Sequence, residues 1–121
     1  MDIKIIDGCF SICKLDDFSK VSLSDDFCFL AKTDEENSLV CRTESVPVHT
    51  AVREDGWRMF RIQGTLDFSL IGILSRISAL MAENRIGIFA VSTYNTDYIL
   101  VKEEQFERAL DALRGDGYRV V

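Results

Sequence analysis

The residues with the clearest potential for chemistry lie in two polar segments that are well separated in the chain. One is Gly64-Thr65-Leu66-Asp67, which precedes a periodic apolar stretch, and the other is Tyr94-Asn95-Thr96-Asp97. Free amide groups at the start of a helix attract an anion such as a carboxylate. The carboxylate of Asp97, and that of Asp67, could pair with an ammonium or guanidinium group. Together these groups suit a zwitterion such as an amino acid. The structural alternatives are helix capping by Asp67 and a turn role for Asp97.

Residue types for catalysis are scarce. His49 is the only histidine among 121 residues, which excludes a metal site built from several histidines, and it has no evident serine or cysteine partner. The four cysteines, Cys9, Cys13, Cys28 and Cys41, contain no C-x-x-C pair, so zinc and thioredoxin-type sites are not indicated. We expect them to be reduced and to serve in packing. The prediction is a protein that is not an enzyme, with no catalytic residues, no metal and no cofactor.

Composition and charge limit the possible partners. The formal net charge is -6, and 47% of the residues are hydrophobic, as in a globular protein with a packed core. A net negative charge disfavours nucleic acid and anionic membrane surfaces. The acidic stretches 25–26 and 34–36 lack the spacing of a calcium loop, so solvated turns are expected there. With no signal peptide and no apolar run of about 20 residues, we expect a cytoplasmic protein that binds neither nucleic acid nor membranes.

The second half of the chain contains the elements that must position the two polar segments. Leu70, Leu74, Ile77 and Met81 recur at helical spacing, and short runs of branched and aromatic residues flank this stretch. The order strand, helix, strand, strand, helix, strand is the α+β, ferredoxin-like (βαββαβ) arrangement, an antiparallel sheet with its helices on one face. The predicted elements are a strand at 57–63, a helix at 68–83, strands at 86–93 and 98–101, a helix at 103–114 and a strand at 118–121.

This topology has a consequence for the polar segments. The first and second strands of such a unit run parallel, two positions apart in the sheet, so their C-terminal ends lie at the same edge. We therefore expect the 64–67 loop and the 94–97 turn to lie close together.

The first half of the chain is less regular. Segments 3–6 and 10–15 predict two strands, or one strand broken near Gly8, and 27–32 with 38–42 predict a hairpin. That hairpin resembles the one at 87–101, displaced by about sixty residues, which suggests an internal duplication. A helical turn is expected over 48–52. We interpret residues 1–56 as a degenerate copy of the unit formed by residues 57–121.

Residues 64–74 (GTLDFSLIGIL) and 88–101 (IFAVSTYNTDYILV) resemble the ACT domain. Within that family they are similar to the branch of CASTOR-like arginine sensors and small bacterial proteins with two tandem ACT units. The resemblance implies an allosteric regulatory module without catalysis, which binds an amino acid at an interface between ACT units. It places the ligand at Gly64, Asp67, Phe68, Leu70, Ile71, Gly72, Ser92, Thr93, Tyr94, Asn95, Thr96 and Asp97.

From the length of the chain, we expect no attached enzyme. Its output would pass through a homo-oligomer, such as a homodimer, or through a protein partner. The alternative function is a structural or dimerisation module without a ligand, which acts through its sheet edges and the exposed apolar parts of Trp57, Phe60 and Tyr118.

Overall fold

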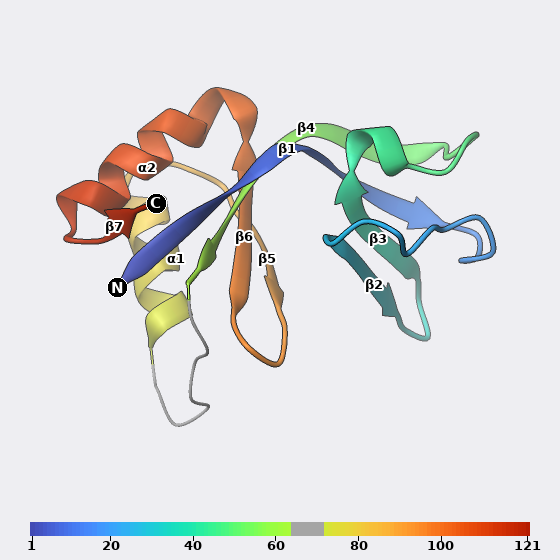
Figure 1. The fold of residues 1–121 in the computed structure, drawn as a ribbon, viewed down its shortest axis with the longest axis horizontal. Helices are drawn as coiled ribbons and strands as arrows, with labels where there is room; N and C mark the ends of the chain where they lie inside the picture. The colour runs from blue at the N-terminus through green and yellow to red at the C-terminus, as the bar shows by residue number, and fades with distance from the viewer. Residues whose placement is uncertain (64–71) are drawn as a thin grey trace. The chain divides into compact units, whose positions relative to one another are not determined.

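The chain divides into two compact units in the computed structural model, which describes residues 1–63 and 72–121. The C-terminal unit consists of Met1–Asp7 and Arg58–Val121, and the N-terminal unit consists of Gly8–Trp57. Two long strands, β1 (Asp2–Leu15) and β4 (Val52–Ile62), contribute residues to both units (Figure 1). The assignment of residues 1–56 and 57–121 to two ACT-like units stays a prediction.

The C-terminal unit has the predicted α+β, ferredoxin-like order, which is confirmed. After β4 come α1 (Ile73–Glu83), β5 (Phe89–Ser92), β6 (Asp97–Lys102), α2 (Phe106–Gly115) and β7 (Arg119–Val120). The strands are ordered β1-β4-β6-β5, and β7 pairs with β1 in parallel. Strands β4 and β5 are therefore two positions apart, with β6 between them, as the sequence predicts.

Both helices pack on the same face of this sheet (Figure 1). Their buried side chains recur at helical spacing, which gives each helix one apolar face. The shared core holds Ile77 and Met81 of α1, Phe106, Ala109, Leu110 and Leu113 of α2, and Ile3, Phe60, Ile62, Ile99 and Val101 of the sheet.

Several element boundaries differ from those expected. Helix α2 begins at Phe106 because residues 103–105 form a turn of 3₁₀ helix, η2 (Glu103–Gln105). Strand β4 begins at Val52, so the helical turn expected over 48–52 is wrong. A single hydrogen-bonded turn forms there instead, in which the Thr50 amide donates to the Pro47 carbonyl at 3.3 Å.

The N-terminal unit repeats the strand hairpin of the C-terminal unit but lacks its helices. It contains β2 (Cys28–Lys32), β3 (Asn37–Arg42) and a 3₁₀ turn, η1 (Thr43–Ser45), and no α-helix is present among its residues, all of which the structure describes. Strands β3 and β6 bury the same three central positions, 39–41 and 99–101. The two hairpins thus correspond position by position at a displacement of sixty residues.

Strand β1 runs without interruption through Gly8, which has a φ of 100°. Of the two expected alternatives, two separate strands is therefore wrong. The alternative of one strand is correct, but the break expected near Gly8 is absent. Glycine adopts such a φ without the steric cost that other residues meet.

The segment 16–27 covers one face of the N-terminal unit in place of a helix. Val21 packs against the small core formed by Cys13, Leu39 and Cys41. Arg42 holds the end of the segment, because its Nη1 donates to Asp25 Oδ1 at 2.6 Å and its guanidinium lies 5.2 Å from the centre of the Phe27 ring.

In the described parts of the chain, no helix is long and apolar enough to cross a membrane.

Candidate functional site

The end of β4 and the β5–β6 hairpin are joined by one buried hydrogen bond. Thr96 Oγ1 donates to the backbone carbonyl of Ile62 at 2.7 Å. Thr96 is buried, with 7% of its surface exposed. Ile62 lies two positions before Gly64 in the chain. We call Ile62, Gln63 and Ser92–Asp97 the rim.

The hairpin side chains of the rim are ordered by one another. Ser92 Oγ donates to Asp97 Oδ1 at 2.6 Å, and Thr93 Oγ1 donates to the Thr96 carbonyl at 3.0 Å. Residues 92–95 are exposed, whereas Asp97 is half-buried. No ion pair to Asp97 is formed by any described residue, so its negative charge is not neutralised within that part of the chain.

Helix α1 begins without a side-chain cap from the described residues. Gly72, its N-cap, has a φ of 85°, and the first turn contains no acidic residue. The amides of that turn carry the partial positive charge of the helix dipole. A hollow of about 320 Å³ lies beside them, lined by Gly72, Ile73, Arg76, Met1 and residues 116–118, and Arg76 Nε donates to Asp116 Oδ2 across it at 3.3 Å.

The structure describes seven of the twelve predicted ligand residues. Gly64, Asp67, Phe68, Leu70 and Ile71 lie outside the described residues, and their roles stay predictions. The described residues are Gly72 and Ser92, Thr93, Tyr94, Asn95, Thr96 and Asp97 of the hairpin. Among these, Tyr94 is 80% exposed, whereas the Thr96 hydroxyl donates its hydrogen to the backbone carbonyl of Ile62.

A second polar group near the rim was not identified from the sequence. Arg61 Nη1 donates to the Tyr98 hydroxyl at 3.3 Å, and Arg61 Nε donates to Gln63 Oε1 at 3.0 Å. Strand alternation places Arg61 and Gln63 on the opposite face from the core residue Ile62. The alternation of residues 60–63 could have indicated this, but the pairing with Tyr98 depends on the sheet register.

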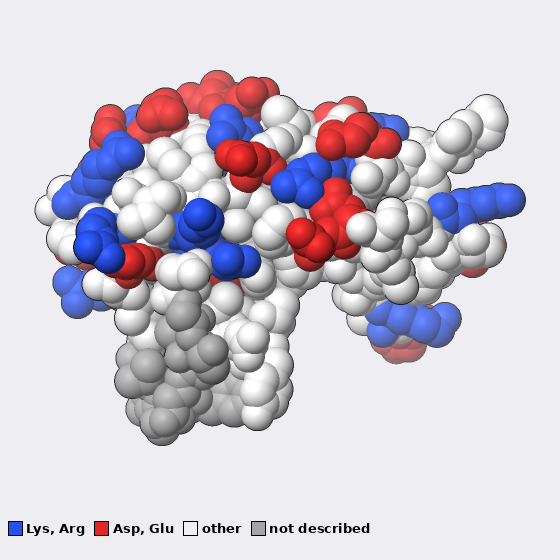
Figure 2. Space-filling view, viewed as in Figure 1, with Lys and Arg blue, Asp and Glu red and all other residues white. Residues whose placement is uncertain are grey.

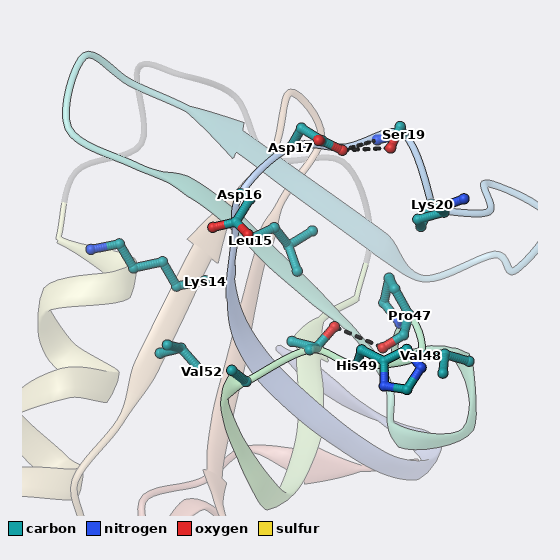
Figure 3. A pocket seen from close by; sticks show the side chains of 12 residues that line it. Lys14, Leu15, Asp16, Asp17, Ser19, Lys20, Pro47, Val48, His49 and Val52 are labelled. Carbon is teal, nitrogen blue, oxygen red and sulfur yellow. Dashed lines mark hydrogen bonds between the residues drawn. The ribbon is translucent and has the colours of Figure 1, made fainter.

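A further hollow, of about 270 Å³, lies in the N-terminal unit and is lined by residues 14–17, 19–20 and 47–52. His49 lies at its border with a φ of 68°. The polar groups that line this hollow do not converge on one point (Figure 3). Lys14 extends away from His49, and the Asp17 carboxylate accepts a hydrogen bond from Ser19 Oγ at 2.5 Å. This arrangement provides no nucleophile and base in contact.

Charged side chains follow one side of α2. Figure 2 shows acidic groups along this helix and the preceding η2, where Glu103, Glu104, Glu107 and Asp111 are exposed. Such a surface repels phosphate groups. Within the described residues, no group of three or more His, Cys, Asp or Glu side chains could hold a metal ion.

A family model described as the ACT domain matches residues 52–115. The chain belongs to the ACT domain family. The matched range of this ACT protein contains both polar segments predicted to bind ligand. Comparison with curated protein sequences gave no match.

Solved structures extend the likeness of this ACT protein to nearly its whole length. Protein Atu0741 from Agrobacterium tumefaciens is 30% identical, with a TM-score of 0.85 over 99% of this chain and 91% of that chain. VC0802 from Vibrio cholerae, a protein of unknown function described as a possible transport protein, is 19% identical, with a TM-score of 0.72 over 93% of this chain and 86% of that chain.

The fold also resembles part of a larger enzyme. The aspartate kinase of Clostridium acetobutylicum, described as an allosteric enzyme, is 13% identical, with a TM-score of 0.65. The match covers 93% of this chain and 33% of that chain. At this identity the likeness concerns the fold alone.

Proposed function

We propose that this ACT protein is an amino-acid-binding regulatory module without catalytic activity. We also infer that it belongs to the branch of CASTOR-like sensors with two tandem ACT units, in which the ligand lies at an interface between ACT units. The correspondence of the two hairpins at sixty residues supports the tandem arrangement, with the N-terminal unit as a degenerate copy.

The observation that carries the proposal is the rim. Thr96 ties the hairpin to the end of β4, and the Asp97 carboxylate has no ion-pair partner among the described residues. An ammonium group would neutralise this carboxylate, and a carboxylate would suit the first-turn amides of α1. An amino acid carries both groups.

A thermal-shift screen with each of the twenty amino acids tests the proposal on protein shown by native mass spectrometry to be free of retained ligand. A ligand present at a hundred times its Kd raises the free energy of unfolding by about 2.7 kcal/mol. We expect this rise for one amino acid or a few related ones. Absence of any shift would refute amino-acid binding.

Replacement of one carboxylate then locates the site. Asp97→Asn removes the charge and keeps an oxygen that can accept the Ser92 hydrogen bond, so we expect the affinity to fall about tenfold or more, the loss of one charge-assisted bond. Asp111→Asn is the matched control, since Asp111 is 76% exposed at the side chain and pairs with Arg114 on α2. Equal affinities in both variants would show that Asp97 is a turn residue only.

A ligand-free dimerisation module is the second candidate, and the edge position of β5 in the sheet favours it. The apolar side chains expected to support it fit less well, because Phe60 is fully buried in the core and its expected exposure is wrong. Light scattering with and without the amino acids separates the two functions. A dimer whose mass and melting temperature do not change with any amino acid would support this candidate.

A further inference from the structure

Three of the four cysteines gather on one face of the N-terminal unit, although they lie on three different strands. Cys28 of β2 is the direct cross-strand partner of Cys41 on β3. On its other side, Cys41 faces Ser11 of β1, and Cys13 lies two positions further along β1. Because strand residues two apart share a face, all three thiols point to the side covered by segment 16–27.

The hydrogen-bond pattern of the hairpin determines how close Cys28 and Cys41 come. The Thr33 amide donates to the Glu36 carbonyl at 2.9 Å, so residues 33 and 36 form a hydrogen-bonded pair. Bonded and non-bonded pairs alternate along an antiparallel ladder. Cys28 and Cys41 are five positions further from the turn and therefore form a non-bonded pair.

Non-bonded pairs bring Cα atoms to about 4.5 Å, with the side chains close together. Disulfides span Cα separations of about 4.4 to 6.8 Å, so this pair lies within their range. The other hairpin illustrates the closeness of a non-bonded pair, because Ser92 and Asp97 join their side chains at 2.6 Å across such a position. Cys13 and Cys41 are instead diagonal neighbours, at a separation of about 7 to 8 Å.

We propose that Cys28 and Cys41 are an oxidation site that closes a disulfide between β2 and β3. The co-reactant is a two-electron oxidant such as a diazene. Each thiol loses one proton and one electron as the S–S bond forms, and the diazene N=N group takes up both protons and both electrons to become a hydrazine. A dithiol reductant reverses the step. This site is independent of the proposed amino-acid binding.

Access and acidity set the rate of this oxidation. Cys28 is half-buried, whereas Cys41 is 2% exposed, so the oxidant meets Cys28 first. Burial raises the pKa of the Cys28 thiol, and burial together with the neighbouring Cys13 and Cys28 raises the pKa of Cys41 to about 12. Because the thiolate is the reacting form, oxidation is slow at neutral pH and speeds up about tenfold per pH unit below these pKa values.

The test treats the full chain with diamide under native conditions, at low protein concentration, and maps the cross-linked tryptic peptides. Trypsin places Cys28 in peptide 21–32, Cys41 in peptide 33–42, and Cys9 with Cys13 in peptide 5–14. We expect the loss of two hydrogen atoms and one cross-link, between peptides 21–32 and 33–42. The same treatment in denaturant should give mixed pairings.

Variants provide the matched controls. Cys28→Ser should abolish the cross-link, whereas Cys9→Ser should leave it unchanged. A link from peptide 5–14 to peptide 33–42, a link between two chains, or no oxidation at alkaline pH would each overturn the proposal. The mapping of the unaltered protein decides the question even if a variant does not fold.

Discussion

The hydrogen bond between Thr96 and Ile62 provides the sharpest test of how the rim is held together. Thr96→Val removes the hydroxyl and keeps the shape of the side chain. The hydroxyl donates at 2.7 Å to the carbonyl of Ile62, a residue with no exposed surface. In the variant a buried carbonyl loses this donor and no water can replace it.

The expected cost follows from that burial. Leaving a buried polar group without its partner costs about 1 to 3 kcal/mol. A carbonyl oxygen has a second lone pair that can accept from another donor, so we take the lower part of that range, about 1 to 2 kcal/mol. The entropy of unfolding of a chain of 121 residues is about 0.25 kcal/mol per kelvin. The melting temperature should therefore fall by about 4 to 8 °C.

Urea unfolding and thermal unfolding measure this loss. Thr93→Val is the matched control, because Thr93 is an exposed residue three positions away, and water can replace the part-buried bonds of its hydroxyl to the Thr96 backbone. We expect the control to cost less than about 0.5 kcal/mol. If both variants lose the same free energy with unchanged urea dependence, the bond to Ile62 does not hold the hairpin to β4, and the reasoning about the rim fails.

Two further predictions concern the N-terminal unit. The Phe27 amide and the Arg42 guanidinium hold the pKa of Asp25 below its ordinary value of 3.8, so the charged carboxylate stabilises the fold above that pH and the stability is lost as the pH falls through the lowered pKa. Acid titration of the free energy of unfolding should show a smaller loss in Asp25→Asn than in the unaltered protein, and equal losses would contradict this. Gly8→Ala should destabilise more than Gly56→Ala in urea unfolding. Both glycines have positive φ, at 100° and 85°, but a Cβ on Gly8 would lie 2.9 Å from Arg42 Nε, whereas one on Gly56 meets open space; equal costs would show that backbone strain alone decides.

The C-terminal unit was predictable because its signals are local. Apolar side chains at helical spacing in α1 and α2, with short runs of branched and aromatic residues between the two helices, specify the element order before any long-range contact forms. The boundary of α2 was less predictable, because residues 103–105, with the acidic Glu103 and Glu104, suit the first turn of an α-helix and a 3₁₀ turn equally well.

The fold of the N-terminal unit was harder to predict, because this unit, which the structure describes in full, has no α-helix and so no apolar residues at helical spacing. The hairpin remained recognisable from its displacement by sixty residues. The turn at 47–50 and the early start of β4 depend on the pairing of β4 with β1, where Asp55 accepts a hydrogen bond from Ser11 at 2.5 Å. Such pairing joins residues far apart in the chain.

The sequence by itself determined the family resemblance, the helices of the C-terminal unit and the polar character of the rim, since each depends on residues within one or two turns or strands. Tertiary structure alone decided that Met1–Asp7 join the C-terminal unit, where Asp2 and Arg119 pair across β1 and β7, and that Cys28 faces Cys41. Sheet register is set by non-local hydrogen bonds and by burial summed over whole strands. A pattern of neighbouring residues therefore does not specify it.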